Sequence, residues 1–368
     1  MADWLSSMQQ TFEYYMVDPY TWTDVKLIDC VKSCTINRDL QTETLGSATI
    51  DVTESVGECY IRVYLVTIQN GVKERFPLGT YLVQTPASSF DGRLHSYSLD
   101  AYTPLIELKE NQPPIGYFVE KSTLPDKCVM IMDVAYNLAQ SYTRAPVVKP
   151  TDSAYTYYDF VADTNDTWLS FISDLIANAK FSLSLDEMSR IIFVKEQKLA
   201  ALQPVWTYND DNSSILYPDL NLDRDIYGIP NVVEVIYSNG GIHCQARVIN
   251  NDGNSPVSTV NRGREIIQRV INPEIQEITG NKEQDEERIQ EYAKELLKSV
   301  STLSYTVSYT HAYCPVRIGD CIRLNYSRAG LSNIKGQVIS QSIKCEPGCP
   351  VTEKAIFTTK LWDGGDTV

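Results

Sequence analysis

The chain has 368 residues, of which 43% are hydrophobic and 21% charged, a composition typical of a globular protein with roughly two to four domains. Its 47 Asp and Glu against 32 Lys and Arg give a net charge of −15, which argues against sequence-independent binding of nucleic acid through a basic surface. The first ten residues lack the basic and apolar regions of a signal peptide, and no stretch reaches the ~18 to 20 apolar residues of a membrane span. We therefore expect a protein that is made, and stays soluble, in a cytoplasm.

The nine Cys match no disulfide framework or metal motif. An odd number cannot pair fully, and the spacings Cys30-x3-Cys34 and Cys345-x3-Cys349 differ from the Cys-x2-Cys of zinc knuckles. We expect free thiols packed as small apolar side chains, with a bridge that forms late as the alternative. No metal and no cofactor is expected.

Residues 22–110 are predicted to form a β-module, preceded by an N-terminal arm over residues 1–21. Apolar and polar faces alternate between positions 60 and 68, as in a half-buried strand. Two-residue turns that need positive φ then favour tight hairpins at Asn70-Gly71 and Asp91-Gly92. Short strands joined in this way favour a barrel or a sandwich.

Between 111 and 200 the pattern predicts an α+β insert. Its clearest helix, 163–180, follows a stretch rich in capping residues and carries one apolar stripe, formed by Trp168, Leu169, Ile172, Leu175, Ile176 and Ala179. A hairpin is predicted next, across Asp186 to Ser189. Residues 201–228 are rich in Asp and Asn and are interpreted as a connector.

A second β-module is predicted over residues 229–368. Three turns are expected to begin or join its strands: Pro230-Asn231, Asn239-Gly240 and Gly319-Asp320. This module carries the best helix of the chain, 281–300, whose acidic start and basic end suit the helix macrodipole. The apolar stripe of that helix consists of Ile289, Tyr292, Ala293, Leu296, Leu297 and Val300.

No catalytic constellation is recognisable. The three His lie on predicted strands, and neither a His-Glu-x-x-His metal motif nor a Gly-x-Ser-x-Gly nucleophile motif occurs. His311 lies near Cys314, but without a supporting motif it is interpreted as a residue at a strand end. The sequence therefore predicts a protein that is not an enzyme.

Four stretches of the chain stand out together by their order and spacing. They are Gly46–Val52 with Ile61–Tyr64 and Phe76–Val83, Thr167–Leu175 with Phe181–Leu183, Ile229–Val235, and Cys314–Ile322. In this order and spacing they resemble the baseplate hub, or tail hub, proteins of bacterial viruses and phage-tail-like particles. Related modules form the N-terminal part of siphophage tail-tip proteins. The resemblance extends from about Gly46 to Leu361, although nine Cys are more than the family leads us to expect.

The resemblance implies a homotrimer in which each subunit carries two tube-like β-barrels. Three chains would then form a ring of pseudo-sixfold symmetry, which joins the sixfold tail tube above to a threefold spike or tip below. Duplication of a module lets three chains present six similar edges. The insert and helix 281–300, through Ile289, Tyr292 and Leu296, would contact neighbouring subunits and surrounding baseplate proteins. Such a protein belongs to the virion and is assembled in the cytoplasm of the bacterial host.

In a tail hub the negative net charge would have a purpose, because a tube that conducts DNA in transit should not bind it. Two other readings stay open. One is a tail-tip enzyme that acts on cell-wall polymer. The other is a tail module that binds the host surface, which an exposed aromatic patch on the insert would favour.

Overall fold

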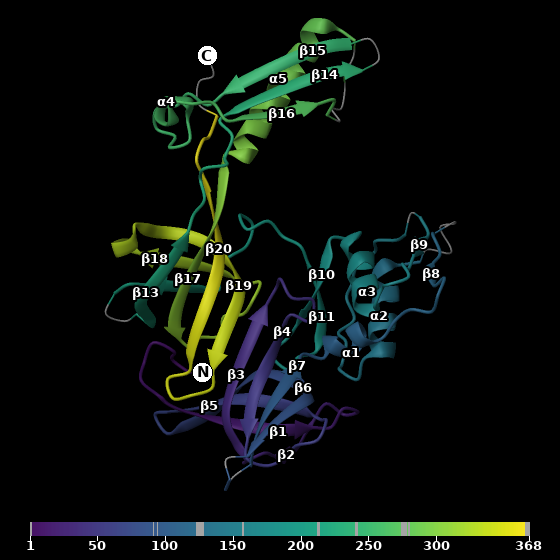
Figure 1. Cartoon of the computed structure of the whole chain (residues 1–368), viewed down its shortest axis with the longest axis vertical. Coiled ribbons are helices and arrows are strands. Elements are labelled where there is room, and N and C mark those ends of the chain that lie inside the picture. The colour runs from purple at the N-terminus through teal and green to yellow at the C-terminus, as the bar shows by residue number, and fades with distance from the viewer. Residues whose placement is uncertain are drawn as a thin grey trace. The chain divides into compact units, whose positions relative to one another are not determined.

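The computed structural model describes residues 2–90, 92–93, 95–122, 129–156, 158–211, 214–239, 242–273, 278 and 280–364 (Figure 1). Strands dominate and helices are few, which confirms the predicted class, α+β and mainly β. Tertiary contacts divide the chain into two units. Unit 1 comprises Met1–Leu220 and Tyr309–Lys354, and unit 2 comprises Asn221–Ser308 and Ala355–Val368. Within the described ranges, no helix is long and apolar enough to span a membrane.

The first segment of the large sheet lies in unit 1, and its strands pair in the order β3-β4-β7-β6-β5-β1-β2. The predicted Asn70-Gly71 hairpin joins β5 to β6. The predicted arm contains β1, which pairs with β5 along its whole length because Tyr14 and its alternate neighbours fit the core face of the sheet. The strands are β1 (Gln9–Val17), β2 (Asp24–Leu27), β3 (Val31–Asp39), β4 (Gly46–Val52), β5 (Tyr60–Gln69), β6 (Val72–Phe90) and β7 (His95–Tyr102).

The second segment of the large sheet follows the order β13-β17-β20-β19, with β18 paired to β19 and β12 to β18. Two of its strands, β12 and β13, lie in the predicted connector. The elements are β12 (Trp206–Asn209), β13 (Leu216–Asp223), β17 (Thr302–Ala312), β18 (Cys321–Tyr326), the 3-10 turn η2 (Ser327–Ala329), β19 (Leu331–Lys344) and β20 (Pro350–Lys360).

The two segments form one continuous 13-stranded sheet. The reason is the length of β19: its first part pairs with β18, and its last residues, Ser340 to Lys344, pair antiparallel with β3. Among the described residues, strand pairing closes neither segment into a barrel, and β13 and β2 are the ends of the pairing path.

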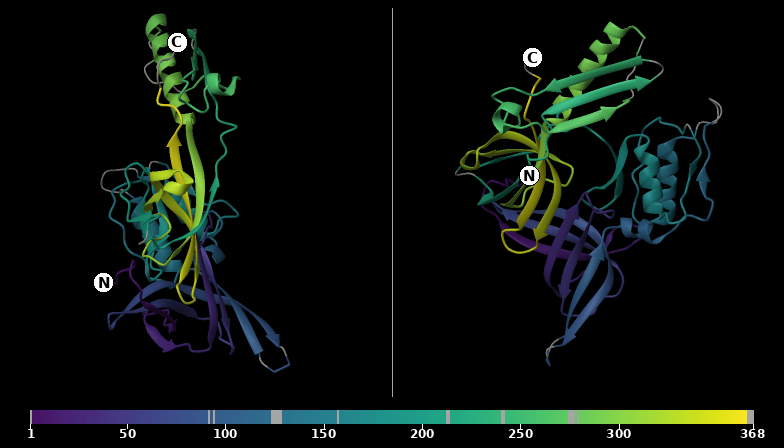
Figure 2. Two further views of the ribbon diagram at one scale, coloured as in Figure 1. Left: turned by 90° about the vertical axis from the view of Figure 1, so that its left-hand side faces the viewer. Right: turned by 45° about the horizontal axis from the view of Figure 1, so that its top comes forward.

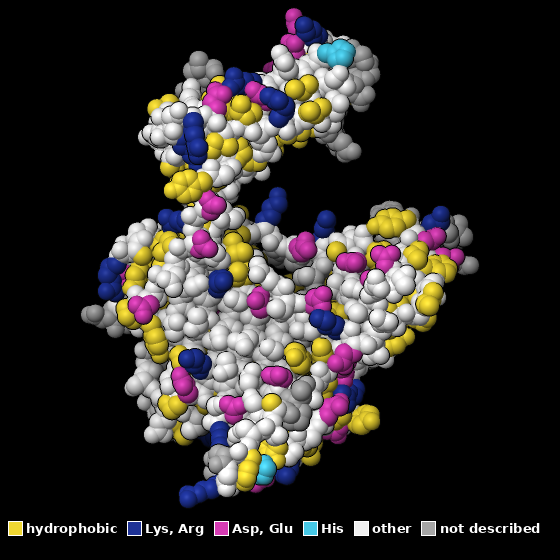
Figure 3. Space-filling model, viewed as in Figure 1, with side chains coloured by type: hydrophobic (Ala, Val, Ile, Leu, Met, Phe, Trp, Pro, Cys, Tyr) yellow, Lys and Arg dark blue, Asp and Glu magenta, His cyan; other side chains and the backbone are white. Residues whose placement is uncertain are grey.

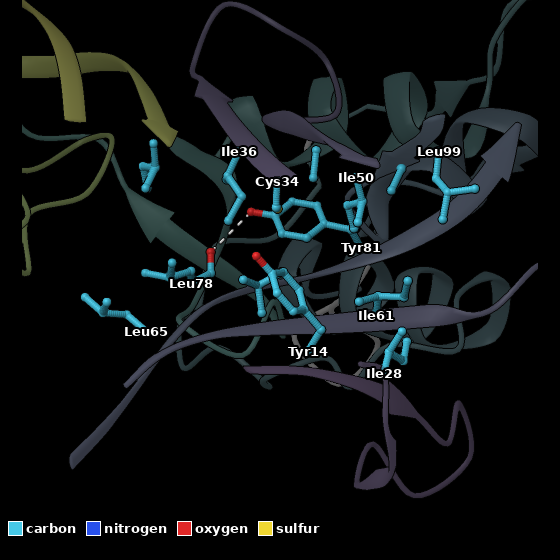
Figure 4. Packing of buried hydrophobic residues seen from close by; sticks show 14 of the residues in the cluster. Tyr14, Ile28, Cys34, Ile36, Ile50, Ile61, Leu65, Leu78, Tyr81 and Leu99 are labelled. Atoms are coloured by element: carbon cyan, nitrogen blue, oxygen red, sulfur yellow. Dashed lines mark hydrogen bonds between the residues drawn. The ribbon is translucent and has the colours of Figure 1, made fainter. Parts of the chain in front are cut away.

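The core of the first segment combines aliphatic side chains with buried tyrosines, among them Tyr14 and Tyr81 (Figure 4). Ile36, Ile50 and Leu99 are fully buried there, and Tyr81 donates a hydrogen bond to the carbonyl of Leu78 over 3.2 Å. Full burial of such side chains contributes about 1.5–3 kcal/mol each. This core fixes the strands on which the residues of the candidate site are placed.

Among the described residues of the predicted insert there are two helices and two small ribbons, and a further helix, α1, comes just before it. Thr167 and Ser170 form a capping box at the start of α3, because the Thr167 hydroxyl accepts from Ser170 N and the Ser170 hydroxyl accepts from Thr167 N. Trp168 and Ile172 are fully buried on the predicted face of this helix. The elements are α1 (Leu105–Glu110), β8 (Phe118–Val119), α2 (Ile131–Tyr142), β9 (Phe160–Val161), α3 (Trp168–Ala177), β10 (Phe181–Leu185) and β11 (Ile191–Lys195).

Unit 2 has two layers, a sheet of order β15-β14-β16 and helix α5 (Figure 2). The hairpin that begins at Pro230-Asn231 thus belongs to a separate three-stranded sheet, whereas the sequence placed it in the second β-module. The apolar stripe of α5 explains this, because Ile289 and Leu297 pack on Val233 and Val235 of β14. The elements are β14 (Val232–Asn239), β15 (Ile242–Ile249), α4 (Thr259–Arg262), β16 (Ile267–Ile271) and α5 (Lys282–Val300).

Candidate functional site

The tip of the β10–β11 hairpin, residues 186–189, is held by the first segment of the large sheet. Trp22 Nε1 and the Thr80 hydroxyl both donate to the carbonyl of Met188, each over 3.0 Å. Thr80 N donates to the Ser189 hydroxyl over 2.7 Å, and Ser189 is buried with φ 58°. A non-glycine residue at positive φ is strained, so the contacts at this tip determine its conformation.

Arg62 is fully buried and orders the residues that grip the tip. Its Nε donates to the Thr80 hydroxyl over 2.8 Å, and its Nη2 donates to the carbonyl of Trp22 over 3.1 Å. Its Nη1 pairs with Asp24 at 2.7 Å, which compensates the buried charge. One guanidinium therefore connects β1–β2, β5 and β6 beneath the hairpin tip.

Gly79 gives β6 the bend that presents Thr80 to the tip. Its φ is 136°, and a Cβ at this position would lie 2.5 Å from the Tyr81 hydroxyl. The register between β5 and β6 shifts at the same place. The Leu-Gly-Thr stretch of the sequence is therefore a β-bulge that only glycine can occupy.

Arg317 holds the same hairpin from the second segment. Its Nη2 donates to the carbonyls of Leu185 at 3.0 Å and Asp186 at 2.8 Å. The predicted turn shapes this contact, because Gly319 has φ 89° and the Asp320 carboxylate accepts from Arg317 N over 2.8 Å. Burial raises the pKa of Asp320, and the nearby Arg317 opposes that rise.

The cavity that remains around this contact is only about 20 Å³. It is lined by both arginines of the junction, Arg38 and Arg317, together with Leu78 and Ser189. That volume holds one water molecule and excludes a substrate or cofactor. The junction between the two segments and the insert is therefore a structural contact.

A buried polar network crosses the seam between β3 and β19. Arg38 Nη2 donates to the carbonyl of Leu78 over 2.6 Å, and Arg38 Nη1 donates to Gln341 Oε1 over 3.1 Å. Gln341 Nε2 donates to Glu353 Oε2 over 2.7 Å and to the carbonyl of Val316 over 2.9 Å. All three side chains are buried, so each unmade bond would cost the full desolvation of its group.

Glu353 is the centre of this network and is fully buried on β20. Tyr309 donates to Glu353 Oε1 in a short hydrogen bond, and Tyr208 donates to the same atom over 3.4 Å. His311 Nε2 lies 3.5 Å from Glu353 Oε2. Burial, followed by the charge of Glu353, raises the pKa values of both tyrosines well above their usual range.

The surroundings of His311 favour its charged form. Its burial alone lowers the pKa, but hydrogen bonding with Cys314 and Glu353 and the charge of Glu353 raise it, to about 10. Its Nδ1 donates to the carbonyl of Ala312 over 2.8 Å. The charged imidazole and the carboxylate thus form a buried ion pair, and Tyr208, Tyr309 and Gln341 donate to the carboxylate.

The structure brings the distant carboxylate of Glu353 to a histidine and a cysteine, His311 and Cys314, that are already close in the sequence. Cys314 Sγ lies 3.9 Å from His311 Nδ1, but the proton on that nitrogen is directed to the carbonyl of Ala312. A nucleophile needs an accessible thiol and a base free to accept its proton. Cys314 is 1% exposed and His311 holds its proton, so the cluster acts as a structural element.

Two predicted turns lie partly outside the described residues. Asn70 and Gly71 have φ 51° and 79° and join β5 to β6. Gly92 has φ 94°, whereas Asp91 lies outside the described residues. Asn239 ends β14, and Gly240 also lies outside them.

Pro230-Asn231 precedes β14, where Asn231 is fully buried. The Asn231 side chain donates to the carbonyl of Arg264 over 3.0 Å and accepts from Ile266 N over 2.7 Å. It therefore ties the start of β14 to the chain that leads into β16. In Pro230-Asn231, the hydrogen bonds of the Asn231 side chain make this connection.

The residues expected to contact a second subunit through helix 281–300 face inward. Ile289 is fully buried, and Tyr292 and Leu296 pack against the same cluster on β14 and β15. The apolar stripe of α5 could be predicted from its helical period. That period does not show whether the stripe packs on the sheet of its own chain or on another subunit. A subunit contact of α5 remains a proposal for its opposite, charged face.

Replacing Arg317 by Ala is expected to lower the free energy of unfolding by about 2 kcal/mol, because two carbonyls of the hairpin tip lose their donor. Urea unfolding and hydrogen exchange of residues 181–195 would measure the loss, which we expect to be concentrated at the tip. The control is Arg328→Ala, whose exposed ion pair with Asp210 spans 3.8 Å. Equal stability of the two variants would contradict the assigned role.

Comparison with known proteins gives structural likeness without sequence likeness. No family model matches the sequence, and no curated protein is similar enough to be a relative. The tail protein from Neisseria meningitidis MC58 has a TM-score of 0.58 at 10% identity, over 95% of this chain and 96% of that one. The 43 kDa tail protein of prophage MuSo2 from Shewanella oneidensis has a TM-score of 0.58 at 11% identity, over the same shares.

Identities of 10% and 11% establish a common fold and nothing finer. The likeness nevertheless spans nearly the whole of each chain, so it includes both segments of the large sheet, the insert and the α5 layer. The chain therefore has the fold of these tail proteins, which confirms at the level of fold the resemblance to phage tail hubs found in its sequence.

Proposed function

We propose that this chain is a structural hub subunit of a phage tail or tail-like particle. Three copies form a ring of pseudo-sixfold symmetry, which joins a sixfold tail tube to a threefold spike or tip. The observation that carries the proposal is the tail-protein fold over 95% of the chain. In this proposal the two segments of the large sheet are the two tube-like β-modules of each subunit.

The polar junction supports this function physically. A ring of three chains presents six similar edges only if the two segments of each chain keep a fixed angle. Arg38, Gln341 and Glu353 cross the seam between the segments, and Arg317 ties the insert to it. We propose that this network specifies the angle, a role that buried polar groups serve in some proteins.

The negative net charge of the chain is consistent with a ring through which DNA passes without binding. The chain carries a net charge of −15, so a lumen with the same balance repels phosphates. In this proposal the partners are further copies of the chain, the tube and spike proteins, and surrounding baseplate proteins. The protein then belongs to the tail of the virion.

The direct test is the mass of the purified full chain by light scattering over a wide range of concentrations, followed by negative-stain imaging. We expect a species of three copies and ring-shaped particles. Where the chain alone is a monomer, the same measurements are repeated with the tube and spike proteins of the same particle. A monomer in both settings would overturn the proposal.

A module that binds the host surface is the second candidate, because the insert exposes apolar and aromatic side chains. Phe118 and Val161 face each other across β8 and β9 and are 53% and 59% exposed, and Tyr158 is 56% exposed. Aromatic faces of this kind stack on sugars or pack on proteins. Binding to bacterial surface polysaccharides that Phe118→Ala and Tyr158→Ala abolish would favour this function.

A further inference from the structure

The sheet of unit 2 is covered by α5 on one face only. Val233 and Val235 point toward the helix and are fully buried. Because side chains alternate along a strand, Glu234 and Ile236 point to the other face. On that face Val232 is buried at the start of β14, whereas Ile236 is 36% exposed, so the face is open toward the end of the strand.

The open face carries exposed isoleucines next to one another. In the parallel register of β14 and β16, Ile236 lies beside Ile271, and Val232 lies beside Ile267. Ile271 is 65% exposed and Ile267 45%. Space-filling atoms show hydrophobic side chains gathered over this sheet, beside charged ones (Figure 3). Three exposed β-branched side chains on one small sheet mark a contact surface.

Arginines flank these isoleucines. Arg247 and Arg269 both pair with Glu234, at 3.4 Å and 2.7 Å, and Arg247 also pairs with Glu265 at 2.5 Å. Arg269 uses Nε and Nη2 on the same carboxylate oxygen, so its Nη1 is left for another acceptor. Both guanidiniums are about half exposed, which suits the rim of an interface that receives carboxylates.

The outer face of α5 carries the complementary charge on the opposite side of the same unit. Its exposed carboxylates are Glu283, Glu286, Glu287, Glu291 and Glu295. Glu286 and Glu295 pair with lysines of the helix. Within the described part of the chain, Glu287 and Glu291 have no ion-pair partner.

We propose that the open sheet face of unit 2 in one copy binds the acidic outer face of α5 in the next copy. The inference rests on the proposed ring and names one of its contacts. The isoleucines would supply buried apolar area, while the Arg–Glu pairs would set orientation and association rate. The two faces lie on opposite sides of one unit, so the contact is heterologous and leads to a ring or a filament, never to a closed twofold dimer.

The test compares association of full-length variants by light scattering and analytical ultracentrifugation. Ile271→Asp, and separately Glu287→Lys with Glu291→Lys, should each weaken assembly by about tenfold or more, because both change exposed groups at the contact. The matched control is Val260→Asp on α4, where Val260 is 64% exposed and belongs to none of the three strands of this sheet. Thermal unfolding confirms that each variant is folded.

Mixing the variants gives the sharpest result. Ile271→Asp keeps an intact helix face, and the double Lys variant keeps an intact sheet face, so their mixture retains one good contact for each pair of chains. We expect a heterodimer that neither variant forms alone. Charge exchange, in which Arg247→Glu and Arg269→Glu are added to the double Lys variant, should restore part of the assembly.

The outcomes separate the inference from the proposed function. If every variant assembles like the unchanged chain, the α5 contact is wrong and the ring stands. If Ile271→Asp fails to assemble but neither mixing nor charge exchange restores it, the sheet face binds something other than α5, and the inference is also wrong. If the unchanged chain assembles neither alone nor with its tube and spike proteins, both the α5 contact and the proposed ring are wrong.

Discussion

Replacing Glu353 by Ala is expected to lower the free energy of unfolding by about 3–5 kcal/mol, the range found when one partner of a buried ion pair is removed. The variant leaves a charged His311 and the hydroxyl of Tyr309 buried without their acceptor. It also removes one of the two acceptors of the Gln341 amide, which spans the seam between the two segments of the large sheet. Urea unfolding followed by far-UV circular dichroism would measure the change in midpoint.

The matched control is Glu54→Ala, at an exposed carboxylate of the same unit. We expect that substitution to change the unfolding free energy by less than about 0.5 kcal/mol. Glu353→Gln should fall between the two, because an amide keeps an acceptor for Tyr309 but loses the charge that faces His311. A loss of less than 1 kcal/mol in Glu353→Ala, roughly the value of a surface ion pair, would contradict the central role of this carboxylate.

Elements whose signals are local could be predicted from the sequence. The β5–β6 hairpin follows from its alternation and from Asn70-Gly71, and α5 follows from its apolar stripe. By contrast, β12 is four residues long and pairs in parallel with β18, a partner more than a hundred positions away. The edge strand β13 is mostly exposed and carries no alternation. Neither strand has a pattern that separates it from a polar connector.

The candidate site shows the same division between local and distant signals. The Gly319-Asp320 turn was predicted, but the residue that it presents was not. Arg317 reaches carbonyls 131 and 132 positions earlier in the chain, and Arg38 reaches Gln341 across 303 positions. A motif scan reads spacings of a few residues, so it places His311 near Cys314 but could not add the distant Glu353 to them. The four stretches that resemble tail hubs contain parts of this junction, but their roles follow only from the fold.

The unfolding free energy is also expected to fall as the pH rises from about 6.5 to about 10, because of His311. The pKa of its imidazole is about 10 in the folded chain, against 6.5 for an ordinary histidine. The stabilisation is therefore complete below pH 6.5 and is lost as the pH approaches 10. Between these limits the folded state binds one proton more than the unfolded state, so the expected slope is about 1.4 kcal/mol lost per pH unit.

Other groups in the same cluster act at higher pH. Burial raises the pKa values of Tyr208 and Tyr309, and also of several thiols such as Cys349, so their unfolded forms ionise first and destabilise the fold further above about pH 8.5. The interval between pH 6.5 and 8.5 therefore isolates the histidine. His311→Gln should flatten the profile there, whatever its effect on stability at one pH.

The control is His243→Gln, which replaces an exposed histidine outside the buried network. Urea unfolding at half-unit steps of pH would compare the three proteins. If the unchanged chain and His311→Gln lose stability at the same rate between pH 6.5 and 8.5, His311 is neutral in the folded chain. The buried ion pair with Glu353 would then be absent, and the seam would be held by neutral hydrogen bonds alone. A clear difference in slope would instead identify the seam as charge-stabilised and make alkaline pH a means of loosening the junction without mutation.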